Sequence, residues 1–90
     1  MAHVTKNQKQ LLTRVRRMGG QVAALENALQ QGGDCADVLV QVAAVRGAAH
    51  GLLMELLADH LAEHVVGADD EATRASEAQV LVELLRRYGK

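Results

Sequence analysis

The chain has 90 residues, a formal net charge of −1 and an apolar content of 49% in which Tyr88 is the only aromatic residue. Its length predicts that residues 1–90 form one small domain. A chain this short buries little surface by itself, so its apolar side chains are best covered between helices and between subunits, and we expect an oligomer.

Several classes of protein are disfavoured by composition and pattern. No unbroken run of 18 or more apolar residues is present, so we expect no membrane span, and "MAHVTKNQKQ" lacks the apolar core of a signal peptide. A single cysteine excludes an internal disulfide and is typical of a cytoplasmic protein. Neither a nucleophile–base pair nor a phosphate-binding loop is recognisable, which argues against an enzyme.

The first predicted helix covers residues 11–29. Its apolar residues follow a spacing of 4, 3, 4, 3, 4, which is a heptad-type seam: Leu11, Val15, Met18, Val22, Leu25 and Leu29. "QQGGDC" ends the pattern, with Gly32 and Gly33 as stop signals and Asp34 as the expected N-cap of the next helix.

The second predicted helix is the longest and runs from about Cys35 to Val66. It carries apolar residues on two faces, which predicts a central position. Gly47 and Gly51, one turn apart among alanines, suggest that a neighbouring backbone approaches there. A third helix, from about Asp70 to Tyr88, follows the turn "GADDEA". The prediction is therefore an all-α protomer of three helices with a long central one.

Two histidines, His60 and His64, lie one helical turn apart in "DHLAEH" and should share a helix face. Cys35 lies at the start of the same predicted helix, where the helix dipole favours a thiolate. On one helix Cys35 and His60 are separated by roughly 37 Å, so they cannot share a site within one chain. They can share one if two copies of this helix pack antiparallel. One thiolate and two imidazoles suit a borderline divalent transition metal.

The N-terminus offers further donors. Removal of Met1 would expose the amine of Ala2, which together with the amide and imidazole of His3 can chelate an ion. Taken alone, this pattern is more often a tail than a ligand set. His50 lies about 80° from His60 around the helix and is interpreted as structural or exposed.

Basic residues dominate the first 25 positions, because the first acidic residue is Glu26. All five basic residues of this stretch are expected to lie off the apolar seam: Lys6, Lys9, Arg14, Arg16 and Arg17. Such a patch, repeated in a tetramer, would contact phosphates and give salt-dependent DNA binding. The chain shows no helix-turn-helix signature, zinc finger or base-stacking aromatics.

The stretches "LLTRVRRMGGQVAALENAL" and "DCADVLVQVAAVRGAAHGLLMELLADHL" resemble the CsoR/RcnR/FrmR family of bacterial repressors, and the likeness covers nearly the whole chain. The resemblance implies a three-helix protomer, an antiparallel dimer through the second helix, and a tetramer made of two dimers. It also implies binding to double-stranded operator DNA in the cytoplasm, with Arg14, Arg17 and Arg46 as contact residues and Lys9 and Arg16 as weaker candidates.

The ligand positions separate the members of this family. Its copper(I) sensors have a second cysteine where this chain has His64, and its formaldehyde sensors combine the matching cysteine with an N-terminal proline where this chain has Ala2. The nickel/cobalt sensors match best, through Ala2, His3, Cys35, His60 and His64. This implies a repressor that responds to Ni(II) or Co(II), with Zn(II) able to bind in vitro, and that derepresses metal efflux. Departures from the pattern are His50, where the family usually has Asn, and Gly20.

Two other functions remain open from the sequence. One is a formaldehyde or thiol-reactive sensor on the same fold that uses Cys35 and the Ala2 amine covalently. The other is a helical metal buffer that does not bind DNA.

Overall fold

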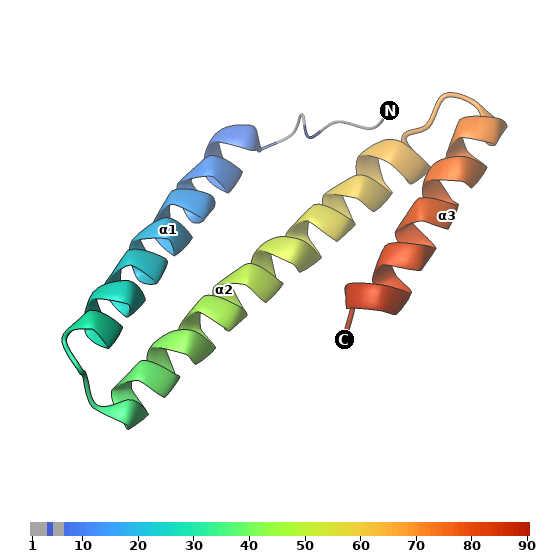
Figure 1. The fold of residues 1–90 in the computed structure, drawn as a ribbon. Coiled ribbons are helices and arrows are strands. Elements are labelled where there is room, and N and C mark those ends of the chain that lie inside the picture. The colour runs from blue at the N-terminus through green and yellow to red at the C-terminus, as the bar shows by residue number, and fades with distance from the viewer. Residues whose placement is uncertain (1–3, 5–6) are drawn as a thin grey trace. The chain divides into compact units, whose positions relative to one another are not determined.

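The computed structural model describes residue 4 and residues 7–90, and within them it contains helices and no strands (Figure 1). The elements are α1 (Gln8–Gln30), α2 (Cys35–His60), the π-helical segment η1 (Leu61–Val66) and α3 (Glu71–Tyr88). The predicted all-α fold with a long central helix is confirmed. The described chain forms two compact units, residues 7–52 and residues 53–90, which are considered in turn.

In the first unit, α1 ends in a tight turn that leads into α2. Gly32 has φ +67°, and the N–H groups of Gly32 and Gly33 donate to the carbonyls of Leu29 (3.2 Å) and Ala28 (2.9 Å). This is a Schellman motif, in which the left-handed position favours glycine. Asp34 then caps α2 as predicted, because its Oδ2 accepts from the backbone N–H of Ala36 at 3.1 Å.

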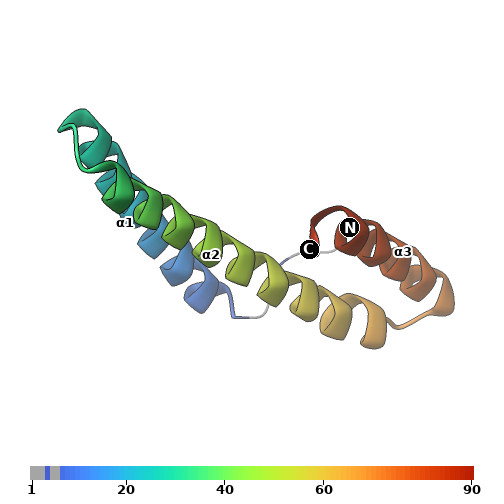
Figure 2. The ribbon, with the colours of Figure 1, turned by 90° about the horizontal axis from the view of Figure 1, so that it is seen from below.

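Along α1 the heptad seam divides between two environments. Leu11 is buried, and Met18 and Leu25 are half-buried. The helix α1 runs beside the first half of α2 (Figures 1 and 2). Val22 and Leu29 are 49% and 62% exposed. One half of the seam therefore packs inside the unit, and the other half is left for another surface to cover.

The contact between α1 and α2 is partly polar, which the sequence did not predict. Arg14 is half-buried on the inner side of α1, and its Nη2 lies 3.0 Å from where a Cβ on Gly51 would be. Gly51 thus accommodates a guanidinium rather than a neighbouring backbone, and Gly47 has no neighbour in reach of a Cβ within the described residues. Among the described residues of one chain, no neighbouring backbone lies within reach of a Cβ at either glycine.

In the second unit, α3 folds back beside η1. Leu57 and Leu81 are its buried residues, each 6% exposed. Asp70 caps α3 by accepting from the N–H of Thr73 at 2.7 Å and from its hydroxyl at 2.9 Å. These two bonds and the nearby Arg74 lower the pKa of the Asp70 carboxyl below its ordinary value of 3.8.

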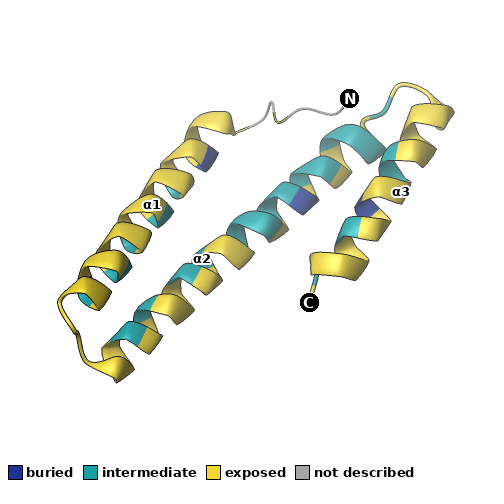
Figure 3. Ribbon diagram, in the orientation of Figure 1, coloured by how far each residue is buried: buried dark blue, intermediate teal, exposed yellow. Residues whose placement is uncertain are grey.

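Most apolar side chains of the described residues are not covered within one chain. Only Leu11, Leu57 and Leu81 are buried, and exposed colours dominate Figure 3. On α2, Leu39 and Val40 are 63% and 68% exposed. Since exposed apolar surface of this extent on a small helical protein usually marks an interaction surface, these residues support the expected oligomer.

By length and composition alone, Cys35–Val66 could also cross a membrane, with a mean hydropathy of 1.2. No membrane span was expected here, because the apolar residues of this stretch are interrupted by polar ones. The signal is weak, because the core helix of a soluble protein passes the same test and this stretch carries Arg46, Asp59 and Glu63 along its length.

Candidate metal centre

The two histidines of the predicted pair lie where α2 changes into η1. The sequence predicted a continuous α-helix to Val66, but the chain adopts π-helical geometry after His60, and the N–H of Gly67 donates to the carbonyl of Ala62 at 3.0 Å. The wider turn of a π-helix alters the angle between side chains four residues apart, and such segments are frequent at functional sites. The imidazoles remain neighbours, with ring centroids 5.1 Å apart and planes inclined by 60°.

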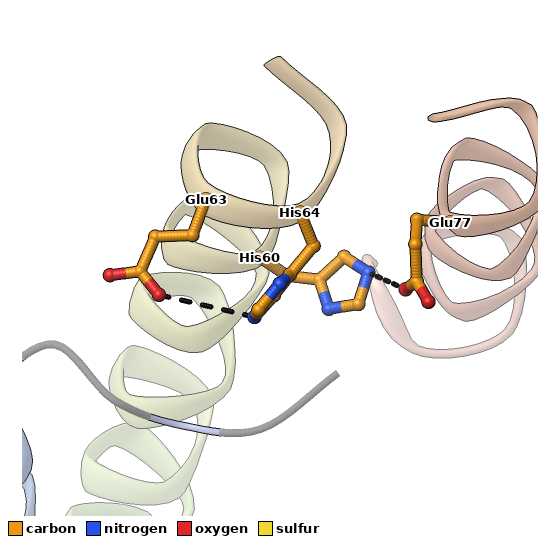
Figure 4. A network of polar contacts seen from close by, with 4 residues as sticks. All are labelled: His60, Glu63, His64 and Glu77. Carbon is orange, nitrogen blue, oxygen red and sulfur yellow. Dashed lines mark ion pairs between the residues drawn. The ribbon is translucent and has the colours of Figure 1, made fainter. Parts of the chain in front are cut away.

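Glu77 of α3 contacts the first histidine. Its Oε2 lies 3.0 Å from Nε2 of His60, and both side chains are about 20% exposed (Figure 4). The contact lacks the geometry of a hydrogen bond, so the buried Nε2 has no hydrogen-bond partner. A carboxylate behind an imidazole orients the ring and leaves its other nitrogen available to a ligand. Glu77 could not be recognised from the sequence, because nothing in the pattern of residues 70–88 distinguishes it from the other acidic residues there.

The second histidine lies at the edge of a cavity. His64 Nε2 is 3.9 Å from Oε2 of Glu63 (Figure 4). The cavity has a volume of about 240 Å³ and is lined by residues of η1, the following turn and α3: Glu63, His64, Gly67, Ala68, Asp69, Thr73 and Glu77. Three carboxylates among these lining residues, Glu63, Asp69 and Glu77, give the cavity beside His64 a negative character that favours cations.

Cys35 is exposed and is the first residue of α2. The backbone N–H groups of Ala36 and Asp37, at the start of the same helix, lie 3.1 and 3.4 Å from the capping Oδ2 of Asp34. Cys35 and His60 are the first and last residues of one 26-residue helix. The geometric premise of the sequence analysis, that these donors occupy opposite ends of a single helix, is therefore confirmed.

Among the described residues of one chain, no group of three or more potential metal ligands is assembled. The donors that are present nonetheless fit a borderline divalent ion, since two adjacent imidazoles suit such a metal. Ala2 and His3 lie outside the described residues. A complete ligand set therefore needs donors beyond this pair.

The candidate DNA-contacting residues differ in their exposure. Lys9, Arg16, Arg17 and Arg46 are exposed, as a phosphate-binding surface requires. Arg14 was expected off the apolar seam of α1 with the other basic residues, but it is half-buried and lies against Gly51 on α2. That expectation is corrected, because the inner side of α1 includes residue 14 as well as the leucines. His50 is exposed, in agreement with its interpretation. Lys6 lies outside the described residues.

Comparison with known proteins finds transcriptional repressors both among family models and among individual relatives. The family model described as "metal-sensitive transcriptional repressor" matches residues 7–87. The transcriptional repressor RcnR of Salmonella typhimurium is 40% identical over 90 residues, covering all of both chains.

Two solved structures extend the comparison. A variant of the formaldehyde-responsive regulator FrmR from Salmonella enterica serovar Typhimurium has a TM-score of 0.87 and 44% identity, over 97% of this chain and 99% of that chain. The nickel-responsive transcriptional regulator InrS has a TM-score of 0.77 and 32% identity, over 98% and 99% of the two chains.

Proposed function

We propose, from the premise that this chain belongs to the metal-sensitive transcriptional repressor family, that it is a cytoplasmic repressor which releases operator DNA when Ni(II) or Co(II) binds. The observation that carries the proposal is the imidazole pair of His60 and His64 with Glu77 behind it. This pair lies at the opposite end of α2 from the exposed thiol of Cys35.

The proposed site forms between two chains. Two copies of α2 packed antiparallel bring Cys35 of one chain to His60 and His64 of the other, and the exposed Leu39 and Val40 on α2 are suited to that contact. Ala2, through its amine, and His3 add the remaining donors. A single thiolate among nitrogen donors favours Ni(II) or Co(II) over Cu(I), which prefers softer, sulfur-rich sites. Residues of two chains would together hold the ion.

A physical route to the DNA surface follows from the start of α1. Asn7 precedes α1 with a left-handed φ of 59° and makes no side-chain capping bond, so the first turn of α1 is weakly fixed. The exposed Lys9 and Arg16 lie within the first three turns. Engagement of His3 only a few residues upstream would restrict this end of α1 and alter the presentation of its cations. An allosteric coupling of typical size, about 1–3 kcal/mol, changes DNA affinity by about 5–150-fold.

The deciding experiment has two stages. The first is an anaerobic Co(II) titration followed by electronic absorption, on the wild type and on Cys35→Ala. We expect a sulfur-to-cobalt charge-transfer band with weak d–d bands in the wild type and loss of that band in the variant. The second stage selects binding fragments from sheared genomic DNA and measures their fluorescence anisotropy with and without Ni(II) or Co(II). Fragments that remain bound at saturating metal would contradict the proposal.

A second candidate is a formaldehyde-responsive repressor, which the 44% identity to FrmR and the exposed Cys35 favour. Its signature is a mass increase with formaldehyde that Cys35→Ala abolishes and that chelators do not affect. DNA release by formaldehyde in metal-free buffer, without release by Ni(II) or Co(II), would make it the preferred function. A metal buffer that never binds DNA does not agree with membership of a repressor family.

A further inference from the structure

Arg74 of α3 binds the end of the π-helical segment that carries His64. Its Nε donates to the carbonyl of Val65 at 3.2 Å, and its Nη2 donates to the carbonyl of Ala68 at 2.8 Å. The last carbonyls of a helix lack partners within the helix. The carbonyl of Val65 otherwise accepts only a longer bond, 3.3 Å, from the N–H of Ala68. One guanidinium therefore clamps two carbonyls that follow His64 closely in the chain.

The guanidinium starts from a fixed backbone. Asp70 caps the first turn of α3 through Thr73, and the N–H of Arg74 donates to the carbonyl of Asp70 at 3.1 Å. Glu77, three residues further along α3 and hence on the same side, contacts the ring of His60. Two side chains of α3 therefore act on the two histidines. Glu77 contacts the ring of His60, and Arg74 binds backbone carbonyls that closely follow His64.

We propose that Arg74 is a positioning residue of the metal site: it holds the π-helical register of η1 that places His64 beside His60. The inference rests on the proposed function. A π-helix is rare and occurs mostly as a single turn within α-helices, and the Arg74 guanidinium is bound at the end of this one. Removal of the clamp would let residues 61–66 move toward α-helical geometry, which rotates His64 about the helix axis relative to His60. The metal would then meet a changed ligand geometry, although both imidazoles are still present.

The test compares Arg74→Met with Arg86→Met, which removes the same charged group from an exposed position near the other end of α3. In anaerobic Co(II) titrations of the full chain, we expect Arg74→Met to bind about tenfold more weakly, as changes to groups that orient metal ligands typically do. Its d–d bands should also shift. Arg86→Met should match the wild type in both respects. Arg74→Lys, which cannot span both carbonyls, should give an intermediate affinity.

A second measurement uses the wild type alone and does not depend on how the variant folds. In ¹⁵N NMR of the metal-free protein, the Nε–H of Arg74 should exchange with water more slowly than that of Arg86, because it is held in a hydrogen bond. Equal exchange of the two groups would overturn the inference. So would an Arg74→Met protein with the affinity and spectrum of Arg86→Met. Absence of Co(II) binding by the wild type would instead refute the proposed metal response, and the NMR comparison would still decide whether the clamp exists.

Discussion

Mixing two inactive variants tests whether the metal site lies between chains. One variant is Cys35→Ala, and the other is His60→Ala/His64→Ala. Within one chain the thiol and the imidazole of His60 are about 37 Å apart along α2, whereas metal–ligand bonds are about 2.0–2.3 Å long. No reorientation of side chains closes that gap, so each variant alone should lose thiolate-linked Co(II) binding.

Mixed antiparallel dimers have one intact site. The proposed antiparallel dimer of the wild type would have two equivalent sites, because in a two-fold interface each contact between the two chains occurs twice. In a mixed dimer, the unmodified Cys35 of one chain meets the unmodified histidines of the other, and the second site lacks all three donors. If half of the dimers are mixed after co-refolding at equal amounts, roughly a quarter of the wild-type sites should return.

The assay is the charge-transfer absorbance of Co(II) per chain at saturation. The control is each variant refolded alone at the same total concentration. A mixture whose charge-transfer absorbance is no higher than the average of the two parent variants would refute the reasoning. It would mean that the thiolate and the imidazoles do not meet across the α2 interface.

Three further predictions concern the surface and the helix ends. Arg17→Ala should weaken DNA binding and reduce the slope of log K against log [salt] by about 0.9 for each phosphate that the side chain no longer neutralises, whereas Arg17→Lys should keep the slope; a fluorescence anisotropy series in KCl measures both. Gly32→Ala forces an L side chain into φ +67° and should lower the free energy of unfolding, measured in urea titrations, by about 1–2 kcal/mol. Gly32→Asn should be destabilised less. Equal destabilisation of the two variants would contradict the role of the left-handed turn. The pKa of the Asp70 carboxyl is lowered in the folded state by its bonds to Thr73. The ionised carboxyl therefore contributes fully to stability above pH 3.8, the ordinary pKa, and this contribution disappears as the pH falls below 3.8. Thermal melts should show lower stability for Asp70→Ala than for the wild type at pH 7, with the difference shrinking toward pH 2.

Local features of the fold could be predicted from the sequence because they depend on residues close together in the chain. The Gly32–Gly33 stop and the Asp34 cap involve hydrogen bonds within six residues, and the apolar spacing in residues 11–29 requires only helical periodicity. The same locality explains why the sequence placed Cys35 and His60 at opposite ends of one helix, and why it predicted an arrangement of two chains for the candidate site.

The remaining features depend on which surfaces meet, and only the tertiary structure decides that. The heptad pattern contained Leu11 but gave no sign that Arg14 would share its inner side, because α2 presents Gly51 there and leaves room for a guanidinium. The π-helical turn at Leu61–Val66 depends on Gly67, whose N–H donates to the carbonyl of Ala62. It also depends on Arg74, whose Nε donates to the carbonyl of Val65, nine residues earlier in the chain. Glu77 meets His60 across 17 positions of sequence for a similar reason. The sequence by itself determined the helices and the kind of donors they carry, since both follow from local hydrogen bonding and side-chain chemistry. The angle between the two imidazoles and the groups that hold them were decided when α3 packed beside η1, because contacts between elements have no periodic signature in the chain.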